Sequence, residues 1–277
     1  MTQRSVLITG CSSGIGLDAA RGLQARGWRV FATCRQEADC ARLRETGLES
    51  FRLDYEDPDS IAAAVEETRA RTGDRLDALF NNGAYALPAA VEDLPTDGLR
   101  AIFEANFFGW HELTRRVIPV MRAQGHGRIV QCSSVLGFSA IKWRGAYVAT
   151  KYALEGLTDT LRLEMRDTPI AVILIEPGPV TSRIRVNSQP HFERWIDWEN
   201  SPRADQYRAS LLKRLYRDAG TPDRFELPPS AVTRKLVHAL ESPHPRPRYY
   251  VTTPTYLVGT LRRLLPTRAL DRVLARG

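Results

Sequence analysis

Long apolar runs are absent from this sequence of 277 residues. The longest, 170–175, is far shorter than the roughly 20 residues that cross a bilayer, and it ends at Glu176. We therefore expect no membrane-spanning helix. Met1 to Ser5 leads directly into a short strand pattern, without the basic segment and apolar run that predict a secretion signal.

Cysteine is scarce, and its spacing argues against two kinds of site. No C-x-x-C pair occurs, so we expect neither a disulfide framework nor a zinc or other metal site. The pattern favours reduced thiols in a cytoplasmic protein. The four cysteines are Cys11, Cys34, Cys40 and Cys132.

A compact basic run with interleaved aromatic residues is also missing, although the net charge is +7. Such a charge permits attraction to nucleic acid, an anionic membrane or a phosphorylated small molecule, and charge alone does not choose among them. Scattered arginines are typical of a solvated surface, so we expect no nucleic-acid partner. Hydrophobic residues make up 43% and charged residues 26%, which fits a single globular domain over 1–277.

The sequence does contain short β-rich runs that alternate with longer helical patterns. Several runs are apolar at consecutive positions, as in strands covered by helices on both faces. The alternation predicts a doubly wound α/β Rossmann fold, with a parallel sheet and a ligand at the carboxyl ends of its strands. Asp57 and Pro58 predict the start of a helix over 61–72, and Gly73 its end. The predicted strands are 6–8, 29–33, 50–53, 78–80, 128–132 and 171–175, with one more at 249–251.

Between 182 and 229 the pattern changes to aromatic residues and prolines among charges, which indicates a helical insertion that forms a substrate lid. Its charges and prolines leave few places for a continuous core, so we expect it to be mobile without substrate. Phe192, Trp195 and Trp198 either wall an apolar pocket or pack the insertion's own helices or an oligomer contact.

The tail, 257–274, predicts one amphipathic helix with arginines along it. Such a helix packs on the core or at a subunit interface, or else touches a membrane surface. Any membrane contact is therefore expected to be peripheral.

A glycine-rich segment directly follows the first predicted strand and opens a helix. Glycine lets the backbone turn tightly and approach a pyrophosphate, whose charge is stabilised by free N–H groups at the helix N-terminus. Its place after the strand makes the segment a predicted dinucleotide site. The residues assigned to it are Gly10, Ser12, Ser13, Gly14, Ile15 and Gly16.

Arg35 follows the second strand, where NAD-binding folds usually place an acid that accepts hydrogen bonds from the ribose 2′-hydroxyl. A guanidinium can hold a 2′-phosphate through two parallel charge-assisted bonds, whereas a carboxylate would repel it. The predicted cofactor is therefore NADP. The alternative is that Arg35 is an exposed loop charge.

Tyr147 and Lys151 are four residues apart, which on a helix places both on one face. A neighbouring ammonium favours the phenolate and lowers the pKa of a tyrosine. Taken alone, such a pair is more often a surface contact. Ser134, at the end of a predicted strand, adds a hydroxyl that can hydrogen-bond a substrate oxygen.

Together these segments resemble the short-chain dehydrogenase/reductase family over nearly the whole chain. The most similar branch contains bacterial aldehyde reductases and the retinol and 17β-hydroxysteroid dehydrogenases, which implies an apolar substrate. The motifs that carry the resemblance are, in order, TGCSSGIG (9–16), LDYED (53–57), FNNGA (80–84), ANFFG (105–109), CSSVLG (132–137), YVATK (147–151) and EPGPVTS (176–182).

The resemblance implies a catalytic set of four residues. Tyr147 would be the acid/base, and Lys151 would lower its pKa and bind the nicotinamide ribose. Ser134 would hydrogen-bond the substrate oxygen. Asn106 would hold a helix irregularity and a water that links Lys151 to solvent.

Further contacts follow from the same resemblance. Asp54 would contact the adenine edge, Asn82 the adenosine ribose, and Thr181 the nicotinamide carboxamide. The remaining predicted contacts are Pro177, Gly178 and Val180 for the cofactor, and Leu136 and Trp143 for the substrate.

One motif departs from the family. Its usual Asn-Asn-Ala-Gly is present as Asn81-Asn82-Gly83-Ala84. If the fourth position required a positive φ, Ala84 would cost about 1 kcal/mol.

The favoured function is an NADP(H)-dependent oxidoreductase for an apolar aldehyde, ketone or alcohol. The family's habit of assembly implies a homodimer or homotetramer. Two alternatives are a catalytically silent NADP-binding sensor and a basic protein that binds a membrane surface or nucleic acid. An intact Asn-Ser-Tyr-Lys set favours the enzyme over the sensor.

Overall fold

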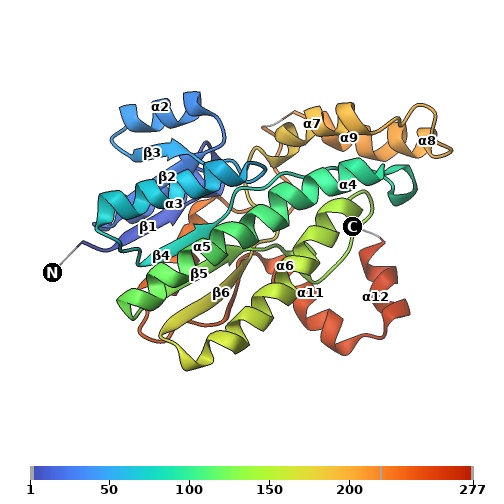
Figure 1. The fold of residues 1–277 in the computed structure, drawn as a ribbon. Coiled ribbons are helices and arrows are strands. Elements are labelled where there is room, and N and C mark those ends of the chain that lie inside the picture. The colour runs from blue at the N-terminus through green and yellow to red at the C-terminus, as the bar shows by residue number, and fades with distance from the viewer. Residues whose placement is uncertain (1–2, 219, 276–277) are drawn as a thin grey trace.

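The computed structural model describes residues 3–218 and 220–275. Seven parallel strands form one sheet in the order β3-β2-β1-β4-β5-β6-β7 (Figure 1). The strand order reverses between β1 and β4, so the predicted doubly wound Rossmann fold is confirmed. The strands are β1 (Ser5–Ile8), β2 (Arg29–Cys34), β3 (Glu49–Arg52), β4 (Ala78–Asn81), β5 (Gly127–Cys132), β6 (Ile170–Glu176) and β7 (Arg248–Tyr250).

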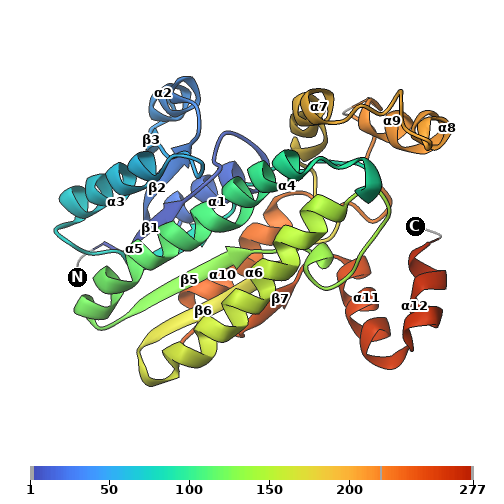
Figure 2. The same ribbon diagram turned by 45° about the vertical axis from the view of Figure 1, so that its right-hand side comes forward.

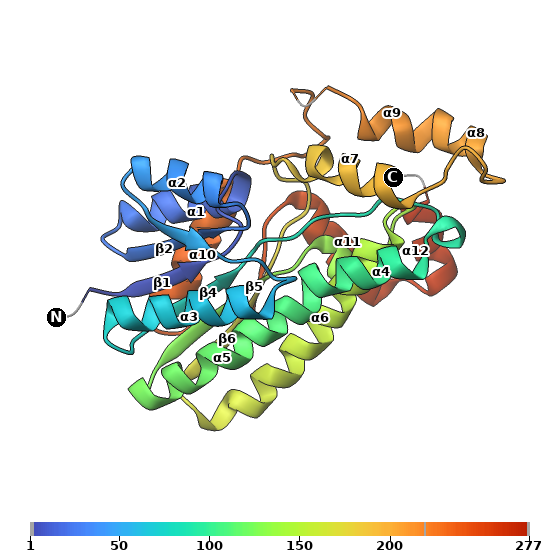
Figure 3. The ribbon, with the colours of Figure 1, turned by 45° about the horizontal axis from the view of Figure 1, so that its top comes forward.

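Helices cover both faces of the sheet (Figure 3). Consecutive apolar residues serve the two faces in turn: Val6 and Ile8 join one hydrophobic cluster, and Leu7 joins the other. The helices on one face are α1 (Gly14–Gln24), α2 (Glu37–Glu45) and α10 (Ser230–Glu241), and those on the other are α3 (Pro58–Thr72), α5 (Gly109–Gln124) and α6 (Gly145–Glu164).

Helix α3 shows how local signals set the ends of an element. The side chain of Asp57 accepts hydrogen bonds from the backbone N–H groups of Asp59 and Ser60, both at 3.1 Å, and Pro58 occupies the first turn. Gly73 ends the helix with a φ of 66°. The predicted start and end of this helix are confirmed.

The described part of the insertion 182–229, called the lid below, contains helical segments that lie beside α4 (Thr96–Phe103) in Figures 1 and 2. They are α7 (Ile184–Trp195), α8 (Ala204–Gln206), a π-helical segment (Tyr207–Leu211) and α9 (Leu212–Leu215). The expectation that the lid has few places for a continuous core is wrong. Its apolar residues form a third hydrophobic cluster with Tyr85, Leu87 and Ile102 of the body. The buried lid residues are Phe192, Ile196, Tyr207, Leu211 and Leu215.

The predicted single helix in the tail is two helices, α11 (Thr253–Leu264) and α12 (Thr267–Leu274). Pro266 disfavours helical backbone at the residue before it, and Leu265 accordingly has an extended ψ of 138°. Helix α12 buries none of its residues and lies at the periphery (Figure 2). Among the helices of the described chain, none is long and apolar enough to cross a bilayer.

All four cysteines are free and buried. Burial raises the pKa of the Cys11, Cys34 and Cys132 thiols, so these thiols stay protonated at neutral pH.

Candidate active site

The glycine-rich loop between β1 and α1 touches the loop after β4. Gly10 and Gly14 have φ values of 68° and 57°, which side chains other than glycine rarely adopt. A Cβ at Gly10 would lie 2.5 Å from the Cα of Gly83, so the two loops approach too closely for a side chain. Ser13 precedes α1 without capping it with its own side chain, which leaves first-turn N–H groups for an anion.

The exchanged Gly83-Ala84 pair fits this contact. A Cβ at Gly83 would lie 3.2 Å from the backbone N of Gly10 and 3.4 Å from the ring of Tyr55, so glycine suits the third position. Ala84 is not among the residues with a positive φ, so the backbone cost considered for it does not arise. The amide of Asn82 donates to the carbonyl of Thr9 at 3.1 Å and ties the two loops together.

Two residues predicted for the adenosine end differ in how they are held. Arg35 is exposed just beyond β2, and within the part of the chain that the structure describes it has no hydrogen bond or ion pair. The carboxylate of Asp54 pairs with Arg52 at 3.2 Å and accepts the N–H of Glu56. The guanidinium of Arg35 is thus free for an anionic partner, while Asp54 is tied to its own loop.

Asn106 lies in a π-helical turn (Glu104–Phe108) that interrupts the helix between α4 and α5. Its side chain exchanges two hydrogen bonds with the backbone of Tyr85: the N–H of Tyr85 donates at 3.1 Å and the carbonyl accepts at 2.8 Å. This buried amide fixes the segment after β4 against the interrupted helix.

Lys151 is buried on α6 with its ammonium at the end of β5. Its Nζ donates to the carbonyl of Cys132 at 2.9 Å and lies 4.1 Å from the ring centre of Trp110. Burial lowers the pKa of Lys151 to about 8, and the negative charge of Glu155 opposes the shift. Trp110 was missed from the sequence. The only signal for it is an aromatic residue directly after the ANFFG motif.

Tyr147 lies one turn before Lys151, and the Nζ of Lys151 is 5.6 Å from the centre of its ring. Burial raises the pKa of Tyr147, whereas the Ser134 hydroxyl and the charge of Arg144 lower it. The pKa was expected to be lowered by Lys151, so the direction is corrected. Desolvation of the phenolate outweighs both the hydrogen bond from Ser134 and the charge of Arg144.

Ser134 follows β5 and lies beside Tyr147. Its hydroxyl accepts the N–H of Leu136 at 3.1 Å and caps a short 3-10 turn. The neighbouring backbone is pinned to the end of β6, since Ser133 donates to Ile175 and Val135 to Pro177, both at 2.8 Å. Ser134, Tyr147 and Lys151 are therefore brought together by β5, β6 and α6.

Four residues predicted for the nicotinamide end are in the loop after β6. Gly178 packs on the side chains of Thr252 and Thr255, and Pro177 is buried. Val180 pairs with Leu227 of the lid, and the hydroxyl of Thr181 donates to Glu226 at 2.7 Å. This loop is thus attached to the lid.

The two residues predicted for substrate contact differ in their surroundings. Leu136 is partly exposed beside Ser134. Trp143, with a φ of 67°, packs its ring 4.8 Å from that of Tyr207. Trp143 therefore packs against the lid core. The same kind of packing was one of the two alternatives considered for the aromatic residues of the lid itself.

Comparison with known proteins agrees with this geometry. A family model described as short chain dehydrogenase matches residues 4–192. The chain belongs to the short-chain dehydrogenase/reductase family. YbbO of Escherichia coli K12, an uncharacterized oxidoreductase, is 40% identical over 272 residues, which cover 98% of this chain and 94% of YbbO. The 17-beta-hydroxysteroid dehydrogenase type 6 of Rattus norvegicus is 34% identical over 280 residues, which cover 98% of this chain and 87% of that protein.

Solved structures of short-chain dehydrogenases share the fold. One from Streptomyces avermitilis has a TM-score of 0.79 at 26% identity, covering 98% of this chain and 96% of that one. A variant of actinorhodin polyketide ketoreductase with NADPH has a TM-score of 0.71 at 27% identity, covering 90% and 95%. The chain is thus an oxidoreductase of this family, in the branch with the hydroxysteroid dehydrogenases, and a nicotinamide cofactor is supported.

In this short-chain dehydrogenase the lid contacts the body at two further places. At its near end His191 stacks on Tyr85, with ring centres 3.7 Å apart and planes 8° apart. Burial lowers the pKa of His191 to about 4, so the stack is neutral at pH 7. At its far end the hydroxyl of Tyr207 donates to Asp93 at 2.8 Å and accepts the N–H of Ala90 at 2.9 Å.

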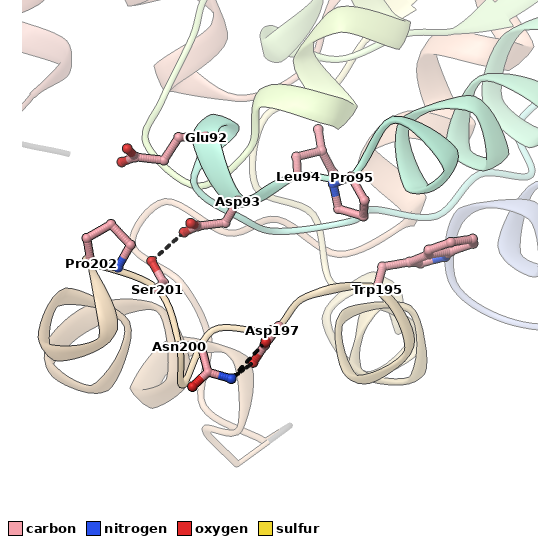
Figure 4. A pocket seen from close by; sticks show the side chains of 9 residues that line it. All are labelled: Glu92, Asp93, Leu94, Pro95, Trp195, Asp197, Asn200, Ser201 and Pro202. Atoms are coloured by element: carbon pink, nitrogen blue, oxygen red, sulfur yellow. Dashed lines mark hydrogen bonds between the residues drawn. The ribbon is translucent and has the colours of Figure 1, made fainter.

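A pocket of about 350 Å³ lies between this far contact and Trp195 (Figure 4). Its carboxylates are already engaged: Asp93 accepts from Ser201 at 2.8 Å, and Asp197 accepts from Asn200. Trp195, considered above as a wall of an apolar pocket, lines it, but none of the residues predicted for catalysis, cofactor contact or substrate contact does, so we assign it to the joint between lid and body. The lining residues are Glu92, Asp93, Leu94, Pro95, Trp195, Asp197, Asn200, Ser201 and Pro202.

Tyr207→Phe should loosen the lid without unfolding the sheet. The change leaves Asp93 and the N–H of Ala90 without their hydroxyl partner, at a cost of about 1–3 kcal/mol. Hydrogen exchange of amides in 184–215 should become faster, with no change in the strands. Tyr216→Phe is the matched control, because this exposed lid tyrosine bonds only Glu193. Equal exchange in all three proteins would contradict the assignment.

Behind Lys151, buried carboxylates share one arginine. Glu155 on α6 and Glu176 at the end of β6 both bond Nη1 of Arg248, whose Nη2 bonds Asp159 at 2.6 and 2.7 Å. Glu176 is fully buried, and burial together with the charge of Glu155 raises its pKa. This carboxylate cluster joins α6, β6 and β7 next to the candidate catalytic residues.

Proposed function

We propose that the chain is an NADP(H)-dependent oxidoreductase that transfers hydride between the nicotinamide and an apolar aldehyde or ketone, or the corresponding alcohol. The observation that carries the proposal is the meeting of Ser134, Tyr147 and Lys151 at the carboxyl ends of β5 and β6. These residue types supply a hydrogen-bond donor, a proton donor and a cation in one place.

The residues around the glycine-rich loop fit a dinucleotide. The first turn of α1 and the positive φ of Gly10 and Gly14 leave a concave backbone with free N–H groups for a pyrophosphate. Lys151 would bind the nicotinamide ribose, and Thr181 would bind the carboxamide. Arg35 would bind the 2′-phosphate that distinguishes NADP from NAD.

In the proposed reaction each residue has a separate task. The reduced nicotinamide supplies the hydride when bound. Tyr147 donates its phenolic proton to the oxygen of the carbonyl, on which negative charge develops. Ser134 hydrogen-bonds the same oxygen and orients it. Asn106 is a positioning residue, because both the oxygen and the nitrogen of its amide bond the backbone of Tyr85 and hold it against the π turn.

Arg35→Asp should abolish or reverse the preference for NADPH over NADH. Hydrogen bonds to a charged group contribute about 1.5–3 kcal/mol, so the Kd for NADPH should rise about 10- to 100-fold or more. Titration of both proteins with both cofactors measures this. Arg100→Gln serves as the control, because Arg100 is an exposed arginine that pairs with Asp97 on α4. Equal affinity of the unmodified protein for the two cofactors would remove Arg35 from this role.

A further inference from the structure

Arg144 lies immediately before α6, three residues ahead of Tyr147. Its guanidinium is mostly surrounded by protein, and burial lowers its pKa to about 10, although the residue as a whole is partly exposed. In the described residues no acceptor forms a hydrogen bond or ion pair with it. The five N–H donors of its guanidinium are therefore not occupied by protein groups of the described residues. Arg144 therefore has donors available to a group that enters from outside.

The charges near Arg144 do not supply that acceptor. The groups whose charge acts on the pKa of Arg144 are two lid residues, Arg214 and Asp223, and the phenol of Tyr147. Asp223 is already held by Arg214 at 3.0 Å and Arg217 at 2.7 Å.

Two further groups on the lid side do not supply a free acceptor for Arg144 either. The side chain of Glu226 accepts from Thr181 and from the N–H of Asp223, each at 2.7 Å. The Nε of Arg217 is buried and also lacks an acceptor among the described residues. Three arginines, Arg144, Arg214 and Arg217, thus lie on this side of the lid with two carboxylates that are already engaged, so positive side chains outnumber the acidic ones beside Tyr147.

We propose that Arg144 binds a carboxylate of the substrate, so that the substrate is an aldehyde, ketone or alcohol with an apolar body and an acidic end. The assignment rests on the proposed oxidoreductase function and narrows its substrate class. A guanidinium pairs with a carboxylate through two parallel bonds, and the N-terminus of the long helix α6 adds a positive dipole at the same place. Arg144 and Tyr147 are one turn apart, so both act on one bound molecule.

A pair of aromatic aldehydes tests this assignment: 4-formylbenzoate and its methyl ester, in which a methyl group replaces the negative charge at the end remote from the aldehyde. For the unmodified protein kcat/KM should be higher for the carboxylate. In Arg144→Gln the ratio of the two kcat/KM values should fall about 10- to 100-fold, mainly through KM for the carboxylate. The ratio cancels any effect of Arg144 on Tyr147, because both aldehydes use the same proton donor.

Two further variants complete the comparison. Arg144→Lys keeps the charge but not the planar fork, so it should recover part of the ratio and shows whether the position tolerates change. Arg208→Gln should leave the ratio as it is, because Arg208 is an exposed lid arginine paired with Asp205. A ratio that stays the same in Arg144→Gln overturns the proposal, even if both rates fall. A raised Kd for NADPH in Arg144→Gln with no change in the ratio would assign Arg144 to the cofactor instead.

Calorimetric titration of 4-formylbenzoate and its ester into the protein separates this proposal from the proposed function. Weaker binding of the carboxylate to Arg144→Gln than to the unmodified protein supports the anion site, even if neither aldehyde is reduced. In that case the result contradicts the proposed function but not the anion site. Equal binding of carboxylate and ester to the unmodified protein overturns the anion site, whether or not either aldehyde is reduced.

Discussion

Tyr147→Phe is expected to lower kcat for carbonyl reduction by about 10²–10⁴-fold, because a positioned general acid contributes about that much to the rate. The ring stays and only the hydroxyl beside Ser134 is lost, so the affinity for NADPH should change little. Absorbance of the reduced nicotinamide gives turnover, and a fluorescence titration gives the Kd. Tyr152→Phe is the matched control, since Tyr152 is an exposed tyrosine on the same helix. Near-normal turnover of Tyr147→Phe on a good substrate would contradict the mechanism.

The pH profile gives a second readout of the same residue. Burial raises the pKa of Tyr147, so the phenol is the form present at neutral pH. Reduction needs that form, and its kcat/KM should fall only as the pH rises through the raised pKa. Oxidation of the alcohol needs the phenolate and should rise through the same range. If the rate of reduction already decreases at pH values under about 7, the pKa of Tyr147 is lowered instead.

Arg248→Met is expected to lower the free energy of unfolding by about 3–5 kcal/mol, because removing one partner leaves buried carboxylates without a cation. Chemical unfolding near neutral pH measures the loss. Arg162→Met is the matched control, since the side chains of both arginines are 28% exposed and both bond Asp159, but Arg162 makes no bond to Glu155 or Glu176. Its loss should be about 1 kcal/mol or less. Equal losses would show that the buried carboxylates do not depend on Arg248.

The stability loss in Arg248→Met should grow with pH. The pKa of Glu176 is raised in the folded protein. The contribution of Glu176 to stability is therefore complete below the ordinary carboxyl pKa of about 4.3, and it is lost as the pH rises through the folded-state pKa. Arg248 opposes that shift, so its removal enlarges the loss. Adding Glu176→Gln should restore most of the stability, because the amide is neutral at every pH. A constant deficit from about pH 5 to about pH 9 would contradict this account.

The strands could be predicted from the sequence because their burial follows a simple rule. Val6, Leu7 and Ile8 are all apolar since neighbouring residues face opposite, equally covered sides of the sheet. The two ends of α3 could also be predicted, because Asp57, Pro58 and Gly73 act within one turn of the helix ends. Local patterns suffice where the interaction that they encode is local.

Interactions between distant segments could not be predicted in this way. Glu155, Glu176 and Arg248 meet only because α6, β6 and β7 are adjacent in the fold, and Trp110 reaches Lys151 across the helix interruption at 104–108. The sign of the pKa shift of Tyr147 was wrong because the spacing of Tyr147 and Lys151 carries no information on desolvation.

The lid and the tail show two further limits of a sequence pattern. Charges and prolines between 182 and 229 suggested a segment without a core. Phe192 and Tyr207 nevertheless pack with residues of the body, and the sequence of the segment alone does not identify those partners. In the tail, Pro266 carried a local signal that the amphipathic pattern obscured. The roles of Asn106, Ser134, Tyr147 and Lys151 come from resemblance and stay predictions, although the fold brings their elements together.

Burial of all four thiols makes the folded chain a convenient background for site-specific labelling. Thiol reagents attack the thiolate at an accessible position, and these cysteines offer little of either. A single cysteine placed at an exposed lid position such as Ser210 would thus stand out as the reactive one, with no native cysteine to remove first. A reporter dye at that position could follow the distance between lid and sheet while substrate and cofactor bind.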